Sequence, residues 1–328
     1  MQFAGNHVMT KKISIQKLAD ELDLAPSTVY RALSGHPNVS LRTRRKVLHA
    51  SQKRGYLLPI HEKGNIAVIV PGFASLIYQG KLLHSLTEAI HRRGFRMLAV
   101  SREDIALLGD HMFDGIISMV WDEGFEQQLP QSFSVPTVIL NGPANLREGI
   151  PNIRSDNPQG IRMALEYLRD RGCRRIFYIS TFDTVHIPDA AERLAVFRQF
   201  CRETGQDHEH MHLEMGSEDF AKALPSVLDA GPDACFCASE TFAAQFGTQI
   251  KAAGKRIPED ISLMGLEDDY ANACFSPPIT AIRQNFEQLA ETAAERIASA
   301  CRDGIPLRDG LIPFTLIERR SVRDPAGK

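Results

Sequence analysis

The hydrophobic positions between residues 14 and 24 ("SIQKLADELDL") recur at the spacing of an α-helix. Ser14 comes directly before this run, and its side chain is suited to an N-cap. The apolar residues fall at i, i+3, i+4 and i+7, which would place them on one helix face. The residues on that face are Ile15, Leu18, Ala19 and Leu22.

Two further helices are predicted over 26–35 and 41–55. Pro26 suits the first helical position, where its missing N–H costs nothing, and the glycine that ends each segment suits a helix stop. Ser40 is placed to cap the third helix. Two short helices joined by a tight turn, with a third packed across them, form a helix-turn-helix unit.

The period of the pattern changes at residue 65, where short and nearly continuous apolar runs begin. Such runs are typical of buried parallel strands, and amphipathic helices lie between several of them. Alternating strands and helices predict a doubly wound α/β sheet, and some 260 residues favour two such lobes. The predicted strands cover 65–70, 95–100, 115–120, 137–140, 176–180, 234–238 and 261–266.

Charge separates the same two parts of the chain. Residues 1–58 contain ten Lys and Arg against three acidic residues, a net charge of +7, which leaves −9 for the rest of a chain whose total is −2. A basic head on an acidic body predicts a polyanionic partner for the head alone.

The second predicted helix has side chains that suit a DNA groove. Val29 and Leu33 would pack inward, while Arg31 points outward and could hold a guanine edge with two hydrogen bonds. Other polar residues of the head would bond phosphates, which fix register but not sequence. The alternative is a solvated three-helix cap without a ligand. The candidate DNA-binding residues are Ser27, Thr28, Tyr30, Arg31, Asn38, Ser40 and Thr43.

Residues 13–56 resemble the DNA-binding domain of the lactose/galactose-repressor (LacI/GalR) family. The matches to the family pattern include Ala19, Thr28, Val29, Arg31 and Leu33. The resemblance implies that bases are read at Pro26, Ser27 and Arg31. Since proline has no side-chain donor and Tyr30 replaces the usual serine, operator preference is expected to be unusual.

The body resembles the periplasmic-binding-protein-like effector domain of the same family along nearly its whole length. The motifs that carry this resemblance are "FDGII" (113–117), "RSDNPQGIRMALEYLRDRGCRRIFYI" (154–179), "PEDISLMGLEDD" (258–269) and "SPPITAIRQNFEQLAETAAERI" (276–297). The implied fold is an all-α helix-turn-helix DNA-binding domain followed by an α/β periplasmic-binding-protein-like domain of two doubly wound lobes.

The resemblance also implies a ligand cleft between the lobes, at the carboxyl ends of the strands. Asp156 would accept hydrogen bonds from ligand hydroxyls, and Arg193 would donate in a fork. Ser239 stands where the family has asparagine, and Glu267 where it has aspartate. A sugar or a small polar metabolite is expected, with an empty cleft as the alternative. The candidate effector-binding residues are Tyr78, Asp156, Arg193, Phe220, Ser239 and Glu267.

The predicted domain boundaries follow from these matches. The DNA-binding domain covers 1–58 (ordered core about 11–58), a short linker covers 59–64, and the effector-binding and dimerisation domain covers 65–328. Lobe 1 is expected over about 65–170 and 283–310, and lobe 2 over about 171–282 and 311–323. Pro59 and Gly64 disfavour a helix in the linker, so we expect none of the hinge helix that the family carries there.

The implied function is a homodimeric, sequence-specific transcriptional regulator, most simply a repressor, that binds a near-palindromic operator. An enzyme is the alternative, but nucleotide-binding, zinc-protease and serine-hydrolase motifs are absent and no cofactor is expected. The opening residues lack an apolar signal-peptide core, so we expect a cytoplasmic protein with reduced cysteines rather than a secreted binding protein.

Two local patterns resemble metal sites, but we expect neither to bind a metal, and we expect no membrane partner. The histidines of "HEHMH" (208–212) are expected in a solvated loop. Cys235 and Cys237 lie in a predicted buried strand, and we expect their sulfur atoms on opposite faces, in the core.

Overall fold

The computed structural model describes two compact units, residues 1–64 and 65–328, each considered by itself. None of the helices that it describes is long and apolar enough to cross a membrane. The structure describes residues 14–33, 38–54, 64–71, 77–107, 113–120, 135–144, 150–180, 188–207, 209–214, 219–239 and 242–324. The linker was predicted at 59–64, where no hinge helix is expected. It lies almost wholly outside these residues.

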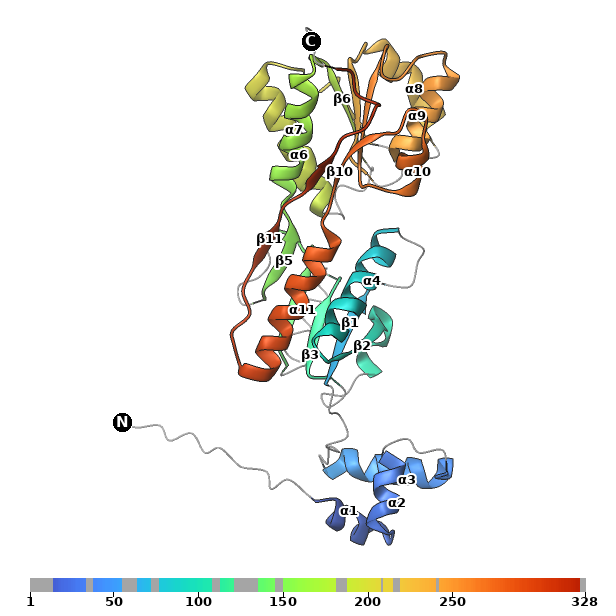
Figure 1. The fold of residues 1–328 in the computed structure, drawn as a ribbon, viewed down its shortest axis with the longest axis vertical. Coiled ribbons are helices and arrows are strands. Elements are labelled where there is room, and N and C mark those ends of the chain that lie inside the picture. The colour runs from blue at the N-terminus through green and yellow to red at the C-terminus, as the bar shows by residue number, and fades with distance from the viewer. Residues whose placement is uncertain are drawn as a thin grey trace, which may run out of the picture. The chain divides into compact units, whose positions relative to one another are not determined.

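The first unit is the predicted three-helix head, built from α1 (Ile15–Leu22), α2 (Pro26–Leu33) and α3 (Leu41–Arg54) (Figure 1). The side chain of Ser14 accepts a hydrogen bond from the backbone N–H of Lys17, and Ser40 accepts one from Thr43, so both predicted caps are confirmed. The helices enclose one small core of Leu18, Ala19, Leu22, Val29, Ala32 and Val47.

The first sheet of the body, as far as the structure describes it, contains six parallel strands in the order β11-β5-β4-β3-β1-β2. Helix α4 (Ile77–Arg92) and helix α11 (Phe286–Asp303) pack together on one face (Figure 1), and the short η1 (Arg102–Leu107) follows β2. The strands are β1 (Asn65–Val70), β2 (Arg96–Ser101), β3 (Gly115–Ser118), β4 (Thr137–Leu140), β5 (Asn152–Ser155) and β11 (Gly310–Ile312).

In the described residues the second sheet also has six strands, in the order β12-β10-β9-β8-β6-β7, and of their pairs only β10–β12 is antiparallel. One face is covered by α6 and α7 and the other by α8, α9 and α10 (Figure 1). The strands are β6 (Ile176–Ser180), β7 (His212–Glu214), β8 (Ala234–Cys237), β9 (Ser262–Leu266), β10 (Thr280–Arg283) and β12 (Thr315–Ile317). The helices are α6 (Asn157–Asp170), α7 (Pro188–Thr204), α8 (Phe220–Asp229), α9 (Phe242–Ala252) and α10 (Tyr270–Cys274).

The chain passes between the two sheets at β5–α6, at β10–α11 and at β11–β12. Helix α6 belongs with the second sheet, because its apolar stripe (Ile161, Ala164, Leu165, Leu168) packs in that lobe's core. The predicted end of lobe 1 near residue 170 was therefore wrong by one helix. Gly160 permits this packing, since a Cβ there would lie 2.5 Å from the ring of Phe314.

The expectation for the two strand cysteines was half right. Residues two apart in a strand point to the same face, and the thiols of Cys235 and Cys237 both lie in the core under α8 and α9. Phe236 between them points into the other core. Burial raises the pKa of the Cys235 thiol to about 12, so both groups behave as small apolar residues. Within the part of the chain that the structure describes, no three His, Cys, Asp or Glu side chains are grouped to hold a metal.

The histidine-rich segment is also only partly a loop. His210 is exposed and contacts Asp207, whereas His212 is half-buried in strand β7, 3.2 Å from the hydroxyl of Ser180. Burial lowers the pKa of His212 below its usual value, so this imidazole is neutral near pH 7. The two rings therefore have different surroundings and do not form a joint site.

Candidate functional site

Helix α2 presents the predicted base-reading residues on the surface of the head. Val29 is fully buried, while Ser27, Arg31 and Tyr30 (50% exposed) point outward. Pro26 is the first residue of the helix, as predicted, and is only partly exposed, like Thr28. This face is therefore polar and basic at its centre.

The second group of predicted DNA contacts lies at the start of α3. Asn38 and Ser40 are exposed and Thr43 is partly exposed. The hydroxyl groups of Ser40 and Thr43 lie 2.8 Å apart, so the cap of α3 and the candidate phosphate contacts are the same residues. A phosphate at this point would meet both hydroxyl groups and the positive end of the helix.

Two contacts hold α3 against α1 and so fix this surface. The ammonium group of Lys46 donates to the carbonyl oxygen of Leu22 (2.9 Å), at the end of α1. The guanidinium of Arg54 pairs with the carboxylate of Glu21 (3.0 Å). The second pair is exposed and contributes little to stability, whereas the first satisfies a helix-end carbonyl.

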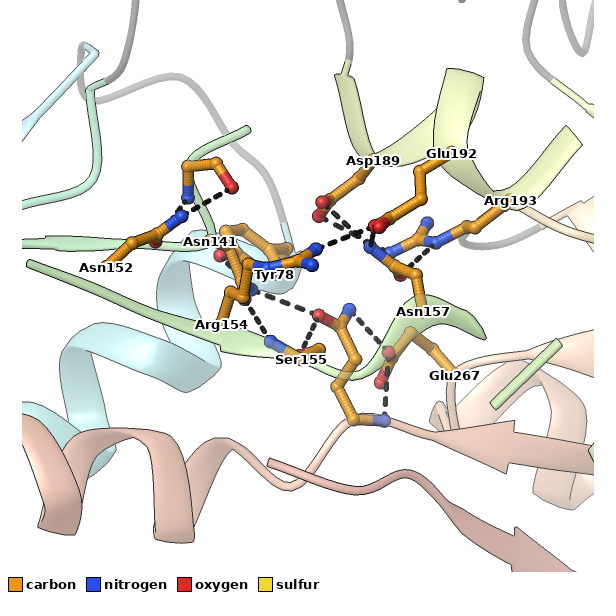
Figure 2. A network of polar contacts seen from close by, with 12 residues as sticks. Tyr78, Asn141, Asn152, Arg154, Ser155, Asn157, Asp189, Glu192, Arg193 and Glu267 are labelled. Atoms are coloured by element: carbon orange, nitrogen blue, oxygen red, sulfur yellow. Dashed lines mark hydrogen bonds and ion pairs between the residues drawn. The ribbon is translucent and has the colours of Figure 1, made fainter. Parts of the chain in front are cut away.

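In the body, a buried hydrogen-bond network joins the two lobes where the chain crosses between them (Figure 2). Asn141, directly after β4, donates from Nδ2 to the hydroxyl of Tyr78 (2.8 Å) and to Oε1 of Gln284 (3.1 Å). Gln284, directly after β10, donates from Nε2 to the carboxylate of Glu267 (2.8 Å). Ser155 donates its hydroxyl proton to the same Gln284 oxygen (2.8 Å).

The orientation of both amides follows from their partners. The backbone N–H of Ser155 can only donate, so the atom of Asn141 that it meets at 2.8 Å is the oxygen. The Glu267 carboxylate, when ionised, can only accept, so the Gln284 atom that faces it is the nitrogen. The hydroxyl of Tyr78 accepts the hydrogen bond from Nδ2 of Asn141.

A second cluster adjoins the first, because Ser155 of the first and Asn157 of the second are two residues apart in the chain (Figure 2). Asp156 stands between them in sequence. Asp156 caps α6 by accepting from the backbone N–H of Gln159 (3.1 Å), and its side chain is half-buried. Arg193, on α7, donates from Nε to the side-chain oxygen of Asn157 (2.8 Å). Four of the six candidate effector residues therefore lie at the junction of the lobes. Tyr78 and Glu267 belong to the first network and Arg193 to the second cluster, while Asp156 stands between Ser155 and Asn157 in the chain.

Ser239 and Glu267 lie at the same edge of the second sheet. Each follows the carboxyl end of its strand, and β8 and β9 pair in parallel with Cys237 opposite Gly265. Glu267 has a φ of +74°, a left-handed conformation that a glutamate rarely adopts, and it is almost fully buried. Backbone strain of this kind is concentrated at functional sites.

Phe220 lies apart from this network. Only 2% of its surface is exposed, and its ring packs edge-on against Phe242 (4.9 Å) and Phe246 (5.5 Å) in the core. The ring has no open face against which a ligand could stack in this conformation. The prediction that Phe220 binds the effector is therefore not supported.

Sequence reasoning missed most of the residues that connect the candidates. Asn141 directly follows a predicted strand, and the rule that ligands bind at the carboxyl ends of strands could have found it. Asn157 and Gln284 stand within the motifs that carried the resemblance. Arg154 also stands in one of these motifs, whereas Asp189 and Glu192 were missed, because their contacts with Asn157 span 32 and 35 residues of sequence.

We expect Gln284→Leu to destabilise the body strongly. The change leaves the Ser155 hydroxyl and one Asn141 N–H without their acceptor and removes a donor to a buried carboxylate. A cost of about 2–4 kcal/mol in the free energy of unfolding follows from groups of these kinds. Urea denaturation of the full chain measures it. Gln199→Leu, which removes an exposed hydrogen bond to Glu203, should cost less than about 0.5 kcal/mol. Equal costs for the two changes would contradict the network.

Comparison with known proteins relates both parts of the chain to transcriptional regulators. A family model described as a periplasmic binding protein-like domain matches residues 165–322. The chain is 26% identical to the HTH-type transcriptional regulator CelR of Thermobifida fusca, over 90% of this chain and 95% of that protein. It is 25% identical to the HTH-type transcriptional repressor CytR of Escherichia coli K12, over 85% of this chain and 87% of the repressor.

Solved structures show the same fold over nearly the whole chain. A complex of the regulator CelR with cellobiose matches with a TM-score of 0.67 at 23% identity, covering 94% of this chain and all of that one. A lac repressor dimer bound to operator and the anti-inducer ONPF matches with a TM-score of 0.70 at 19% identity, covering 95% of this chain and all of that one. The predicted two-part fold is confirmed.

Proposed function

Since the chain belongs to the LacI/GalR family of transcriptional regulators, we propose that it represses transcription as a homodimer on a near-palindromic operator. The family consists of DNA-binding regulators, so the chain is not an enzyme. We propose further that it acts in the cytoplasm and that a sugar or a similar small polar metabolite modulates it.

The interlobe network is the observation that carries the effector proposal. It holds Tyr78 and Glu267, and the adjoining residues Asp156 and Arg193 lie at the same point, where the chain passes between the lobes. One carboxylate oxygen of Asp156 accepts the hydrogen bond that caps α6, and the other would accept hydrogen bonds from ligand hydroxyls. Arg193 keeps N–H groups beyond the one given to Asn157, and these would donate to ligand oxygens. This pairing of acceptor and donor suits a hydroxyl-rich molecule.

The head supports the operator proposal. Arg31 and Ser27 of α2 would read base edges, while Tyr30, Asn38, Ser40 and Thr43 would bond phosphates. In a symmetric dimer two such heads would occupy two half-sites, and operator symmetry would mirror protein symmetry. A ligand that favours one arrangement of the lobes would shift the placement of the heads, with a coupling of about 1–3 kcal/mol.

A thermal-shift screen of neutral sugars and nucleosides on the full chain tests the effector proposal. A true effector at about 100 times its Kd should stabilise the body by about 2.7 kcal/mol. It should also change operator affinity by roughly 5- to 150-fold. Asp156→Asn serves as the matched variant, because asparagine can still cap α6 but carries no carboxylate. A hit that stabilises this variant as strongly as the natural chain would contradict the role of Asp156.

A further inference from the structure

Four charged side chains surround Asn157 at the junction of the lobes (Figure 2). Asn157 donates from Nδ2 to the carboxylates of Asp189 (2.9 Å) and Glu192 (2.8 Å), both on α7. Arg154, on β5 of the first sheet, pairs with Glu192 at 2.8 Å. Arg193 pairs with Asp189 at 3.6 Å. The two carboxylates thus share one amide, and each faces one guanidinium.

This cluster is neutral and largely shielded from water. Side-chain exposures are 15% and 22% for Arg154 and Glu192, and 10% and 17% for Arg193 and Asp189. Charges at such depth are screened much less than surface charges, so each carboxylate compensates its guanidinium effectively. Burial raises the pKa of Asp189, and Arg193 is the main group that opposes this rise.

The carboxylate beside each guanidinium determines which ligands can bind to Arg193. A phosphate, sulfate or carboxylate is held by uncompensated cations, through charge-assisted hydrogen bonds. Here such an anion would approach Arg193 beside the negative charge of Asp189, and Arg154 beside that of Glu192. An uncharged hydroxyl group meets no such repulsion, because it needs only an N–H to accept from and an oxygen to donate to.

Resting on the proposed effector site, we infer that Asp189 and Glu192 are specificity-determining residues that exclude anionic ligands and favour uncharged, hydroxyl-rich ones. A phosphorylated sugar or a nucleotide would be rejected, while the unmodified sugar or nucleoside would be admitted. Asp189 acts on the ligand through Arg193, and Glu192 acts through Arg154.

Sulfate is a suitable probe, because its charge does not change near neutral pH. Isothermal titration of the full chain with sodium sulfate, at constant ionic strength, compares the natural chain with Asp189→Asn. The variant should bind sulfate at least about 10-fold more tightly, the effect of about 1.4 kcal/mol of lost repulsion. Adding Arg193→Met should remove the gain. Glu192→Gln, which releases Arg154, should give a gain of the same sign and provides a second variant if the first does not fold.

Asp260→Asn is the matched control. Asp260 also pairs with an arginine four residues away, Arg256, on an exposed part of the body. The control changes the net charge equally and should leave sulfate binding within twofold of the natural chain. The inference is overturned if neither Asp189→Asn nor Glu192→Gln gains affinity, or if the gain survives Arg193→Met. The titration needs no DNA, so its result does not depend on whether an operator is found. Failure to find an operator would contradict the proposed function but would leave the result of the titration unchanged.

Discussion

Raising the salt concentration from 50 to 200 mM should weaken the complex of this protein with duplex DNA by roughly 10³-fold or more. The head carries a net charge of +7, and a dimer would present two heads. Each phosphate that is neutralised releases counterions, so the logarithm of the affinity falls by about 0.9 per contact for each tenfold rise in salt. With roughly six to ten contacts, the loss reaches three or more orders of magnitude.

Fluorescence anisotropy across a salt series measures this slope. Arg45, exposed on α3, is a candidate phosphate contact, and Arg45→Gln should reduce the slope by about 1 for each head that makes the contact. Lys255→Gln, an equal charge change on the acidic body, should leave the slope unchanged. An affinity that is indifferent to salt would contradict a DNA-binding role for the head.

Replacing Arg31 by alanine should remove most of the preference for operator over random DNA. A bidentate contact from arginine to a guanine edge is worth about 1–3 kcal/mol in discrimination, or roughly 5- to 150-fold for each half-site. Arg31 is exposed near the end of α2, while Val29 and Ala32 anchor the helix in the core of the head. The substitution should therefore change recognition without unfolding the head.

Affinities for the operator and for a random duplex, measured side by side, separate base recognition from non-specific electrostatic binding. Arg45→Ala is the matched control, because it removes the same charge from a position that is expected to contact only phosphate. The control should weaken binding to both duplexes alike. An equal loss on both duplexes for Arg31→Ala would refute the base-reading role of Arg31.

The head could be predicted almost completely, because its signals are local. Helix spacing, two serine caps and a proline at the first helical position lie within 41 residues, and each acts on its neighbours. Several strands of the body could also be predicted, since β1, β4 and β6 are nearly continuous apolar runs. These features depend little on distant contacts.

The strands at the junction of the lobes could not be found in this way. β5 (Asn152–Ser155), β10 (Thr280–Arg283) and β11 (Gly310–Ile312) have three or four residues, and β5 and β10 include polar ones. In β5, Arg154 and Ser155 take part in the contacts at the junction of the lobes, so this strand lacks an apolar run. The apolar stripe on α6 predicted a helix, but a stripe of this kind does not show which of the two sheets the helix covers.

The candidate site was predicted in its separate residues but not in its connections. The resemblance supplied Tyr78, Asp156, Arg193 and Glu267. Asn141 and Gln284, which join Tyr78 to Glu267, do so through contacts 63 and 143 residues apart in sequence. The periodicity of apolar residues along the chain cannot predict contacts between residues so far apart in sequence. The absence of a hinge helix between the head and the body stays a prediction from the proline and glycine of the linker.

Selection from a pool of random duplexes by the full-length chain tests the central claim most directly. The account predicts enrichment of one near-palindromic site with two half-sites, bound by the natural chain and not recovered with Arg31→Ala. Recovery of no consistent sequence, at a salt concentration where the chain still binds DNA, would contradict the assignment of this protein as a sequence-specific regulator.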